Sequence, residues 1–198
     1  MARVSDAPAE AASPRERVLR AALRLIGTEG LGAVSHRQVA RDAEVSLGTL
    51  TYHFRDRDEL LRESLRLLVG EEVARLEAIG AGLRTGELGL ADLDQLVGTA
   101  MAGVVDVSLT VAQFELYLHA TRDPRLRDAV AECRAAYDGL AREALVLLGV
   151  PDPDEVAPLV VSTVDGLALR RLVTGEDVTA ATTRALLLLA AGARALAG

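Results

Sequence analysis

The sequence predicts an all-α protein of about nine helices, and three observations support this fold class. Half of the 198 residues are hydrophobic but only 3% are aromatic, so the chain is rich in helix formers and poor in side chains that favour strands. No segment alternates between apolar and polar residues with a period of two, as a half-buried strand does. Capping residues stand at many of the places where a helical apolar pattern begins.

Four helices are predicted in the first 80 residues. Ser13, Pro14 and Glu16 form a capping box with proline at the first helical position. A second capping box begins at Ser35, and Ser46 and Asp56 are the expected capping residues of the third and fourth helices. The predicted spans are about 14–29, 35–42, 47–53 and 56–79.

Five further helices are predicted after a glycine-rich loop. Residues 80–89 contain four glycines, which disfavour a helix. Pro124 and Pro153 each follow an aspartate and mark helix starts, whereas Pro158 is expected to kink or restart the helix that contains it. The predicted spans are about 90–105, 108–121, 124–148, 153–174 and 179–196.

The net charge of −7 is distributed unevenly along the chain. Residues 1–60 hold nine arginines and nine acidic residues, whereas the other 138 residues hold thirteen arginines and twenty acidic residues. The acidity therefore belongs to the C-terminal part, and the N-terminal part is able to approach phosphate groups. The overall acidity does not exclude a nucleic-acid partner.

Several classes of function are disfavoured. A single cysteine, Cys133, permits no intrachain disulfide, suits a reducing cytoplasm and is expected to be buried and inert. No apolar run approaches the ~20 residues needed to cross a bilayer, and residues 1–12 resemble a disordered tail rather than a signal peptide. Without a Walker loop, nucleophile elbow or Rossmann fingerprint, we expect no catalytic residue and no cofactor. Glu115 and His119 stand one helical turn apart without a third ligand, so no metal site is expected.

Residues 35–60 have the spacing of a helix-turn-helix. Two short helices are separated by the three residues 43–45. The small side chain of Ala40 lets the helices cross closely, and Val39, Val45 and Leu50 fill the space between them. In such a unit the second helix presents its N-terminal residues to base edges in the major groove of DNA.

This segment closely resembles the DNA-binding region of the TetR family of bacterial regulators. The matching residues are Val39, Ala40, Ala43, Val45, Ser46, Gly48, Leu50, Tyr52, His53, Phe54, Arg57, Glu59 and Leu60. The resemblance implies a three-helix reading head joined to a helical bundle that dimerises and binds a ligand. Two positions depart from the family pattern. Glu44 replaces a glycine whose φ is often positive, at a cost of about 1 kcal/mol if that angle is kept, and Thr51 replaces a tyrosine.

The helix starts and the resemblance together nominate residues that contact DNA. The residues expected near phosphate groups are Ser35, Ser46, Tyr52, His53 and Arg57. The residues expected at base edges are Arg37, Leu47, Thr49 and Thr51. The alternative for each residue is a purely local role in capping, packing or solvation, and Phe54 is expected to pack against the first helix.

The last two predicted helices are apolar on most faces, which indicates burial against a second copy of the chain. The alternative is that they form the core of a monomer. By resemblance, an effector pocket lies among the helices of residues 90–148 and the helix that begins at Pro153. Its candidate residues are Met101, Phe114, Tyr117, His119, Tyr137 and Asp165, and the prevailing Ala, Leu and Val residues favour an apolar effector.

These features predict a cytoplasmic, homodimeric repressor that binds a pseudo-palindromic operator in double-stranded DNA and is released by a small-molecule effector. Residues 13–60 are the predicted DNA-binding domain, residues 61–198 are the predicted dimerisation and effector-binding domain, and no membrane partner is expected. Two alternatives stay open. One is a regulator that senses no small molecule and is controlled by abundance or by a protein partner. The other is a small all-α enzyme or cofactor-binding bundle with a degenerate helix-turn-helix.

Overall fold

The structure is a computed structural model that describes residues 12–87, 97–99 and 106–197, and it contains no strand within these ranges. The predicted all-α fold is confirmed. The α-helices are α1 (Pro14–Glu29), α2 (His36–Asp42), α3 (Leu47–His53), α4 (Arg57–Thr85), α6 (Val107–Ala120), α7 (Arg127–Leu147), α8 (Pro153–Thr174) and α9 (Thr179–Ala197). Two short 3₁₀ helices are η1 (Leu31–Ala33) and η4 (Pro124–Leu126).

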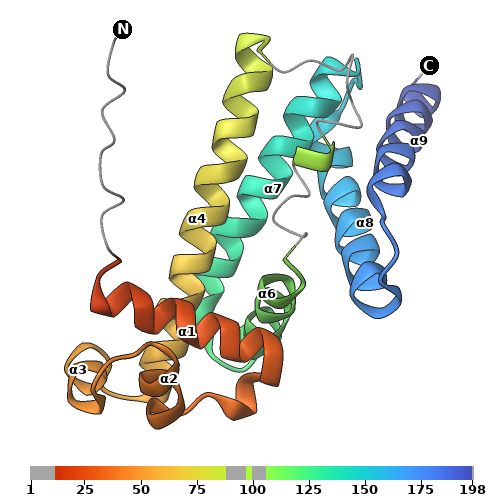
Figure 1. Ribbon diagram of the computed structural model, residues 1–198. Helices are drawn as coiled ribbons and strands as arrows, with labels where there is room; N and C mark the ends of the chain where they lie inside the picture. Colours follow the sequence, from red (N-terminus) through yellow and green to blue (C-terminus); the bar gives the residue numbers. More distant parts are fainter. Residues whose placement is uncertain (1–11, 88–96, 100–105, 198) are drawn as a thin grey trace, which may run out of the picture.

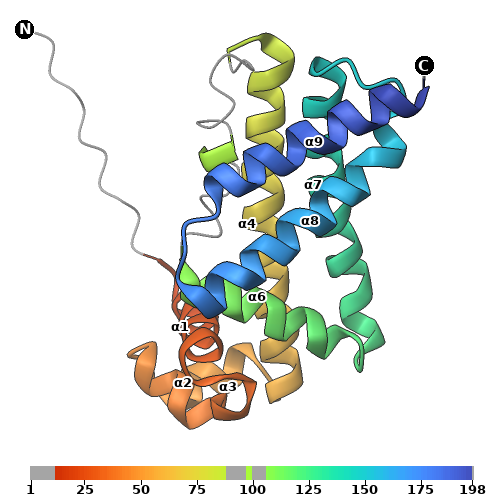
Figure 2. The same ribbon diagram turned by 90° about the vertical axis from the view of Figure 1, so that its right-hand side faces the viewer.

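The helices form a head and a bundle. Helices α1, α2 and α3 gather at one end of the long helix α4, and α7 runs beside α4 (Figure 1). Helices α8 and α9 lie side by side across the α4–α7 pair, and α6 passes between the head and α8 (Figure 2). The head and the outer face of α9 therefore belong to different ends of the molecule.

The side chains predicted to cap the first four helices do so. The side-chain oxygens of Ser13, Ser35, Ser46 and Asp56 each accept a hydrogen bond from the backbone N–H three residues later, at 3.2, 3.3, 2.9 and 2.7 Å. Each bond satisfies one of the N–H groups that a helix start leaves without an intrahelical acceptor. Local sequence signals are therefore sufficient to place these helix starts.

Helix α4 is longer than the sequence predicts, because it continues through the expected glycine-rich loop to Thr85. Gly80 and Gly82 are buried in this last part, where α4 packs against α7. A Cβ atom on Gly80 would lie 2.6 Å from a carboxylate oxygen of Glu143 on α7, so the Glu143 side chain lies directly against this glycine. The loop prediction is wrong for residues 80–85, because packing outweighs the low helix propensity of glycine.

Three further predictions concern helix boundaries in the bundle. The helix expected over residues 90–105 lies outside the described residues, apart from the helical residues 97–99. The helix expected from Pro124 begins as the 3₁₀ helix η4, in which the Asp123 carboxylate accepts from the N–H of Arg125 at 3.1 Å. Helix α8 contains Pro158 without restarting there.

Buried apolar side chains form two clusters. The first joins α1–α4 to α6 and to the first turns of α7, and it includes Phe54 from the head and Leu116 from α6. The second lies between α7, α8 and α9 and includes Leu145, Val161 and Leu186. The head therefore shares its core with α6 instead of forming one by itself.

Helix α9 is exceptional among the described helices, because it alone is long and apolar enough to cross a membrane by length and composition. Its mean hydropathy is 1.3 over an 18-residue window, of which 22% is buried. The predicted absence of an uninterrupted apolar run of this length is not contradicted, because Arg184 and Arg194 interrupt the run although its mean hydropathy is high. Leu186 and Ala190 pack into the second cluster, which is the behaviour of a bundle helix.

Candidate functional site

Buried residues hold the helix-turn-helix from its inner side. Val39 of α2, Leu50 of α3 and Phe54 after α3 are almost completely buried and belong to the cluster that contains α1. The guanidinium of Arg15 on α1 lies 5.5 Å from the centroid of the Phe54 ring, within the range of a cation–π interaction. As predicted, Phe54 packs against the first helix, and α3 is fixed with its other side open to solvent.

The open side of α3 carries several of the residues predicted to contact DNA. The side chain of Tyr52 is 85% exposed and that of Leu47 is 43% exposed, and Thr51 is also exposed. His53 is half-buried and meets Tyr52 edge to face, with ring centroids 5.1 Å apart. A tyrosine with so much exposed surface adds little to the packing of its own chain.

The first residues of α2 and α3 are also at the surface. Ser35 and Arg37 are exposed at the start of α2, and Ser46 is exposed before α3. The hydroxyl of Ser46 accepts from the N–H of Thr49 and shares a second hydrogen bond with the Thr49 hydroxyl at 2.8 Å. Both serines therefore cap their helices, and each places a hydroxyl beside N–H groups of the kind that bind phosphate oxygens.

The turn between α2 and α3 has the backbone angle expected from the sequence. Glu44 has a φ of 53° and is the single non-glycine residue with a positive φ among the described residues. Its carbonyl oxygen accepts from the guanidinium of Arg17 on α1 at 2.8 Å, and the N–H of Val45 donates to the carbonyl of Ala40 at 3.0 Å. These bonds hold a glutamate in a conformation that favours glycine.

Arg57 has a role inside the head that the sequence did not indicate. Its Nε donates to the carbonyl of Val34 at 2.9 Å, and one Nη donates to the carbonyl of Leu31 at 2.5 Å. The guanidinium thus ties the start of α4 to the connection between α1 and α2. Its expected phosphate contact has only the remaining N–H donors to use.

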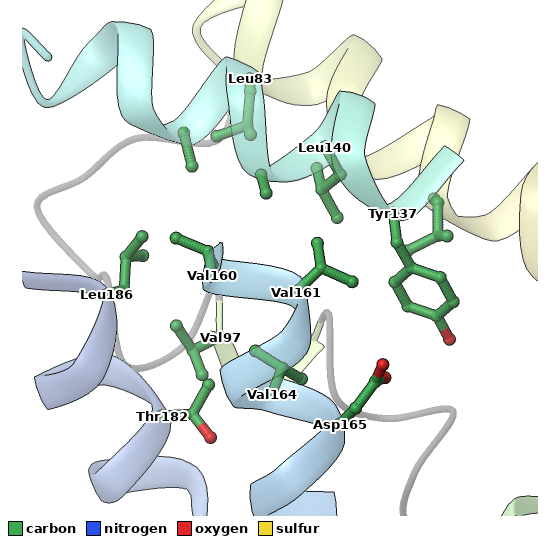
Figure 3. A pocket seen from close by; sticks show the side chains of 13 residues that line it. Leu83, Val97, Tyr137, Leu140, Val160, Val161, Val164, Asp165, Thr182 and Leu186 are labelled. Atoms are coloured by element: carbon green, nitrogen blue, oxygen red, sulfur yellow. The ribbon is translucent and has the colours of Figure 1, made fainter. Parts of the chain in front are cut away.

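A cavity of about 100 Å³ lies in the bundle, between α4, α7, α8 and α9 (Figure 3). Its wall is mainly apolar and includes Leu76, Leu83, Leu140, Val160, Val161, Val164 and Leu186, together with Val97. Tyr137, Asp165 and Thr182 are the polar residues of the described wall. An apolar wall with a few placed polar groups is typical of a small-molecule site.

The cavity contains two of the six residues predicted for an effector pocket. Tyr137 of α7 and Asp165 of α8 line it, and Met101 lies outside the described residues. Phe114, Tyr117 and His119 of α6 are not part of its wall. The Tyr117 hydroxyl instead accepts from the side-chain amide of Gln113 at 3.1 Å.

Other residues of the cavity escaped prediction because their helices were placed elsewhere. Leu83 falls in the segment predicted to be a loop, and Thr182 and Leu186 fall in a helix assigned to dimerisation. The signal that was available is the helical spacing of Leu76 and Leu83, which are seven residues apart and share one side of α4.

Ion pairs surround the polar edge of the cavity. Glu72 of α4 accepts from the Tyr137 hydroxyl and from Arg75, whose Nη lies 2.6 Å away. Burial alone would raise the pKa of Glu72, but the hydrogen bonds from Arg75 and Tyr137 outweigh it and lower that pKa. Asp165 lies 2.5 Å from a guanidinium nitrogen of Arg134 on α7, yet burial raises the pKa of the Asp165 carboxyl above its ordinary value.

The surroundings of Glu115 and Cys133 indicate structural roles for both residues. The Glu115 carboxylate accepts from the backbone N–H of Leu31 at 2.6 Å, and the described residues contain no group of three side chains able to hold a metal ion. Cys133 is buried, and burial raises the pKa of its thiol. A raised pKa disfavours the thiolate, which is the reactive form.

Comparison with known proteins identifies the family. Residues 18–64 match the family model described as bacterial regulatory proteins of the tetR family. Residues 85–192, more than half of the chain, match the model described as a tetracyclin repressor-like C-terminal domain. The chain belongs to the TetR family. It is a transcriptional regulator with a DNA-binding head and not an enzyme.

Individual TetR-family proteins agree with this assignment. The chain is 27% identical over 112 residues to the HTH-type transcriptional repressor KstR2 of Mycolicibacterium smegmatis, and the match spans 57% of the chain and about half (52%) of that protein. It is 33% identical to the multidrug binding protein EbrR crystallised with imidazole, covering 90% of the chain and 95% of EbrR with a TM-score of 0.65. A TetR-family member from Streptomyces coelicolor A3 is 32% identical, with 90% and 98% covered and a TM-score of 0.70.

Proposed function

We propose that this TetR-family regulator is a homodimeric repressor that binds a pseudo-palindromic operator and leaves it when a small molecule occupies the bundle cavity. Residues 13–60 read the DNA, and residues 61–198 dimerise and sense the effector. Because its target is chromosomal DNA, it acts in the cytoplasm. The observation that carries this proposal is the surface of α3, which exposes Tyr52 and Leu47 while Leu50 fixes the helix from behind.

The DNA contacts follow from the positions of side chains at the start of α2 and along α3. We assign Ser35, Ser46, Tyr52 and His53 to phosphate oxygens, because they lie at or near helix ends and carry hydrogen-bonding groups. The residues assigned to base edges are Arg37, Leu47, Thr49 and Thr51. Arg57 supports the head through Leu31 and Val34 and reaches a phosphate only with the donors it has left.

The dimer is supported by the outer face of α8 and α9. These two helices carry large apolar side chains that are 44–91% exposed in the single chain: Leu159, Leu169, Val173, Leu187, Leu188 and Leu196. Pairing the two helices with those of a second copy would bury them in a four-helix interface around a two-fold axis. A two-fold dimer also supplies two reading heads for two half-sites.

Effector control is supported by the cavity and by relatives. A regulator controlled only by abundance or by a protein partner has no need of an apolar cavity inside its bundle. The multidrug binding protein EbrR, 33% identical to this chain, has been crystallised with ethidium, proflavin and malachite green. The dimer would have one conformation whose two heads fit the half-sites and another whose heads are spaced wrongly for them. A ligand releases DNA only to the extent that it binds the second conformation more tightly than the first.

The residues assigned to phosphates and to base edges together form the proposed reading surface. Two substitutions test this assignment. We expect Tyr52→Phe to weaken binding to every DNA sequence by a similar factor, because it removes a phosphate contact. We expect Arg37→Ala to cost about 1–3 kcal/mol of discrimination at one base pair, because it removes a contact to a base edge. Affinities for a set of operator variants at several salt concentrations measure both effects.

The control is Arg142→Ala, which removes an exposed arginine of α7 that pairs with Asp154. This variant should bind DNA as the wild type does. Wild-type affinity and specificity in all three variants would contradict the proposed reading surface.

A further inference from the structure

The polar groups of the cavity wall offer hydrogen-bond acceptors and no free hydroxyl donor. The Tyr137 hydroxyl donates to Glu72, and the Thr182 hydroxyl donates to the backbone carbonyl of Val178 at 2.9 Å. Asp165 contributes a carboxylate, which accepts only. A ligand that carries only acceptors or a negative charge therefore finds no hydroxyl of the described wall to bind it.

The charge around this edge of the cavity is negative. Glu72 is paired with Arg75 and Asp165 with Arg134, and the charge of Asp138 also acts on Asp165. Asp138 stands one turn after Arg134 on α7, and its Oδ1 is buried with no hydrogen-bond partner among the described residues. Its charge acts on Asp165 and opposes ionisation there. Two carboxylates thus share the influence of one arginine, and an added positive charge would relieve their repulsion.

Asp165 is also placed where a ligand can reach it. Its side chain is 42% exposed, and Figure 3 shows the carboxylate at the edge of the cavity, below Tyr137 and beside Val164. The apolar wall continues inward from this point through Val161 and Val160. The geometry suits a molecule with a hydrocarbon or aromatic body and a positive charge at one end.

We propose that the effector is a lipophilic monocation, whose apolar body lies among the valines and leucines of α4, α8 and α9 and whose charge lies beside Asp165. The inference rests on the proposed role of the cavity as the effector site. It predicts that carboxylates and other anions bind the cavity more weakly than cations, because a guanidinium nitrogen of Arg134 already pairs with Asp165.

A matched set of small probes tests the charge preference. Benzyltrimethylammonium and 2,2-dimethylpropylbenzene have the same shape, with a charged nitrogen in one and a neutral carbon in the other, and 3-phenylpropionate is an anion of similar size. We expect the full chain, without DNA, to bind the cation at least tenfold more tightly than the neutral probe and to show no binding of the anion. Titration by NMR chemical shifts measures the three affinities.

Three variants locate the effect. Asp165→Asn should abolish the preference for the cation, and Asp138→Asn, which leaves the Asp165–Arg134 pair in place, should reduce it. Asp154→Asn is the matched control, because Asp154 is also on α8 and pairs with an arginine of α7, at 2.7 Å from Arg142, but does not line the cavity. Thermal melting confirms folding of each variant.

Equal binding of the cation and the neutral probe by the wild type, or no binding of the cation at millimolar concentration, would overturn the proposal. So would a preference that survives in Asp165→Asn and Asp138→Asn alike. DNA release is measured separately. If the cation binds but operator affinity is unchanged, ligand-controlled release fails while the ligand class stands. If a neutral or anionic molecule releases the operator, the ligand class fails while the regulator stands.

Discussion

At the scale of single residues, Glu44 in the turn of the helix-turn-helix has a backbone conformation that favours glycine, the residue without a side chain. Glu44 has a φ of 53°, a left-handed conformation that costs an ordinary residue about 1–2 kcal/mol. Among the described residues, none forms a hydrogen bond or ion pair with the Glu44 side chain, since the observed bond from Arg17 reaches the Glu44 carbonyl oxygen. Any residue at this position would keep that bond, so the strain belongs to the Cβ atom.

Glu44→Gly should therefore stabilise the protein. We expect the free energy of unfolding to rise by about 1 kcal/mol, measured by urea denaturation. The control is Glu77→Gly, at an exposed position inside α4, where glycine should lower the free energy of unfolding by about 1 kcal/mol. A loss of stability in both variants would show that the backbone at Glu44 is not strained.

At the scale of elements, the contact between α1 and α6 joins the head to the bundle. Near the end of α1, a Cβ atom on Gly27 would lie 2.0 Å from the carbonyl oxygen of Ser108 on α6. A few residues further on, Glu115 of α6 accepts from the N–H of Leu31, whose carbonyl is bound by Arg57. One short connection is thus held both by α6 and by α4.

Gly27→Ala should disrupt this crossing although alanine is the better helix former. We expect a loss of about 1–3 kcal/mol in the free energy of unfolding, because the added methyl group meets backbone. Gly70→Ala is the matched control, since Gly70 lies inside α4 and a Cβ there has no neighbour within 4 Å. That variant should gain up to about 1 kcal/mol. Equal gains at both positions would contradict the close approach of α1 and α6.

The elements also show which features can be predicted from sequence. The starts of α1–α4 depend on a capping side chain and the next three residues, so local patterns locate them. The end of α4 depends on a helix more than fifty residues away, because Gly80 is helical against Glu143 of α7. The pattern of Gly80 and Gly82 is the same in a loop and in a buried stretch of helix.

The two candidate sites differ for the same reason. The reading surface lies within residues 35–57, and its exposed residues could be nominated from one short motif. The cavity is assembled from four helices, so its wall depends on how these helices pack. Tyr137 and Asp165 were predicted from their chemistry alone, whereas Leu83 and Leu186 become neighbours only through tertiary structure.

At the scale of the whole molecule, one side of the bundle is incompletely covered. Leu188 of α9 is 66% exposed and borders two shallow hollows on the outer surface of α8 and α9. Together with the other exposed leucines and valines of α8 and α9, Leu188 forms apolar surface of the kind that commonly marks a protein–protein interface. A second copy of the chain would cover it in the proposed dimer.

Leu188→Glu should dissociate that dimer, because association would bury an unpaired charge. We expect the variant to sediment as a monomer and to bind the operator at least tenfold more weakly. Leu118→Glu is the control: Leu118 of α6 is 65% exposed and lies on another helix, so this variant should stay dimeric. A dimeric Leu188→Glu would show that α9 is not at the interface.

The core shared by the head and α6 also limits how this regulator can be recombined. Ala112 and Leu116 of α6 are buried in the same cluster as Leu50 and Phe54 of the head. A graft of residues 13–60 onto the bundle of another regulator would keep the motif but lose its packing partner. The exchangeable unit is the head together with α6, so a change of operator through inheritance or design requires both parts to be transferred or repacked together.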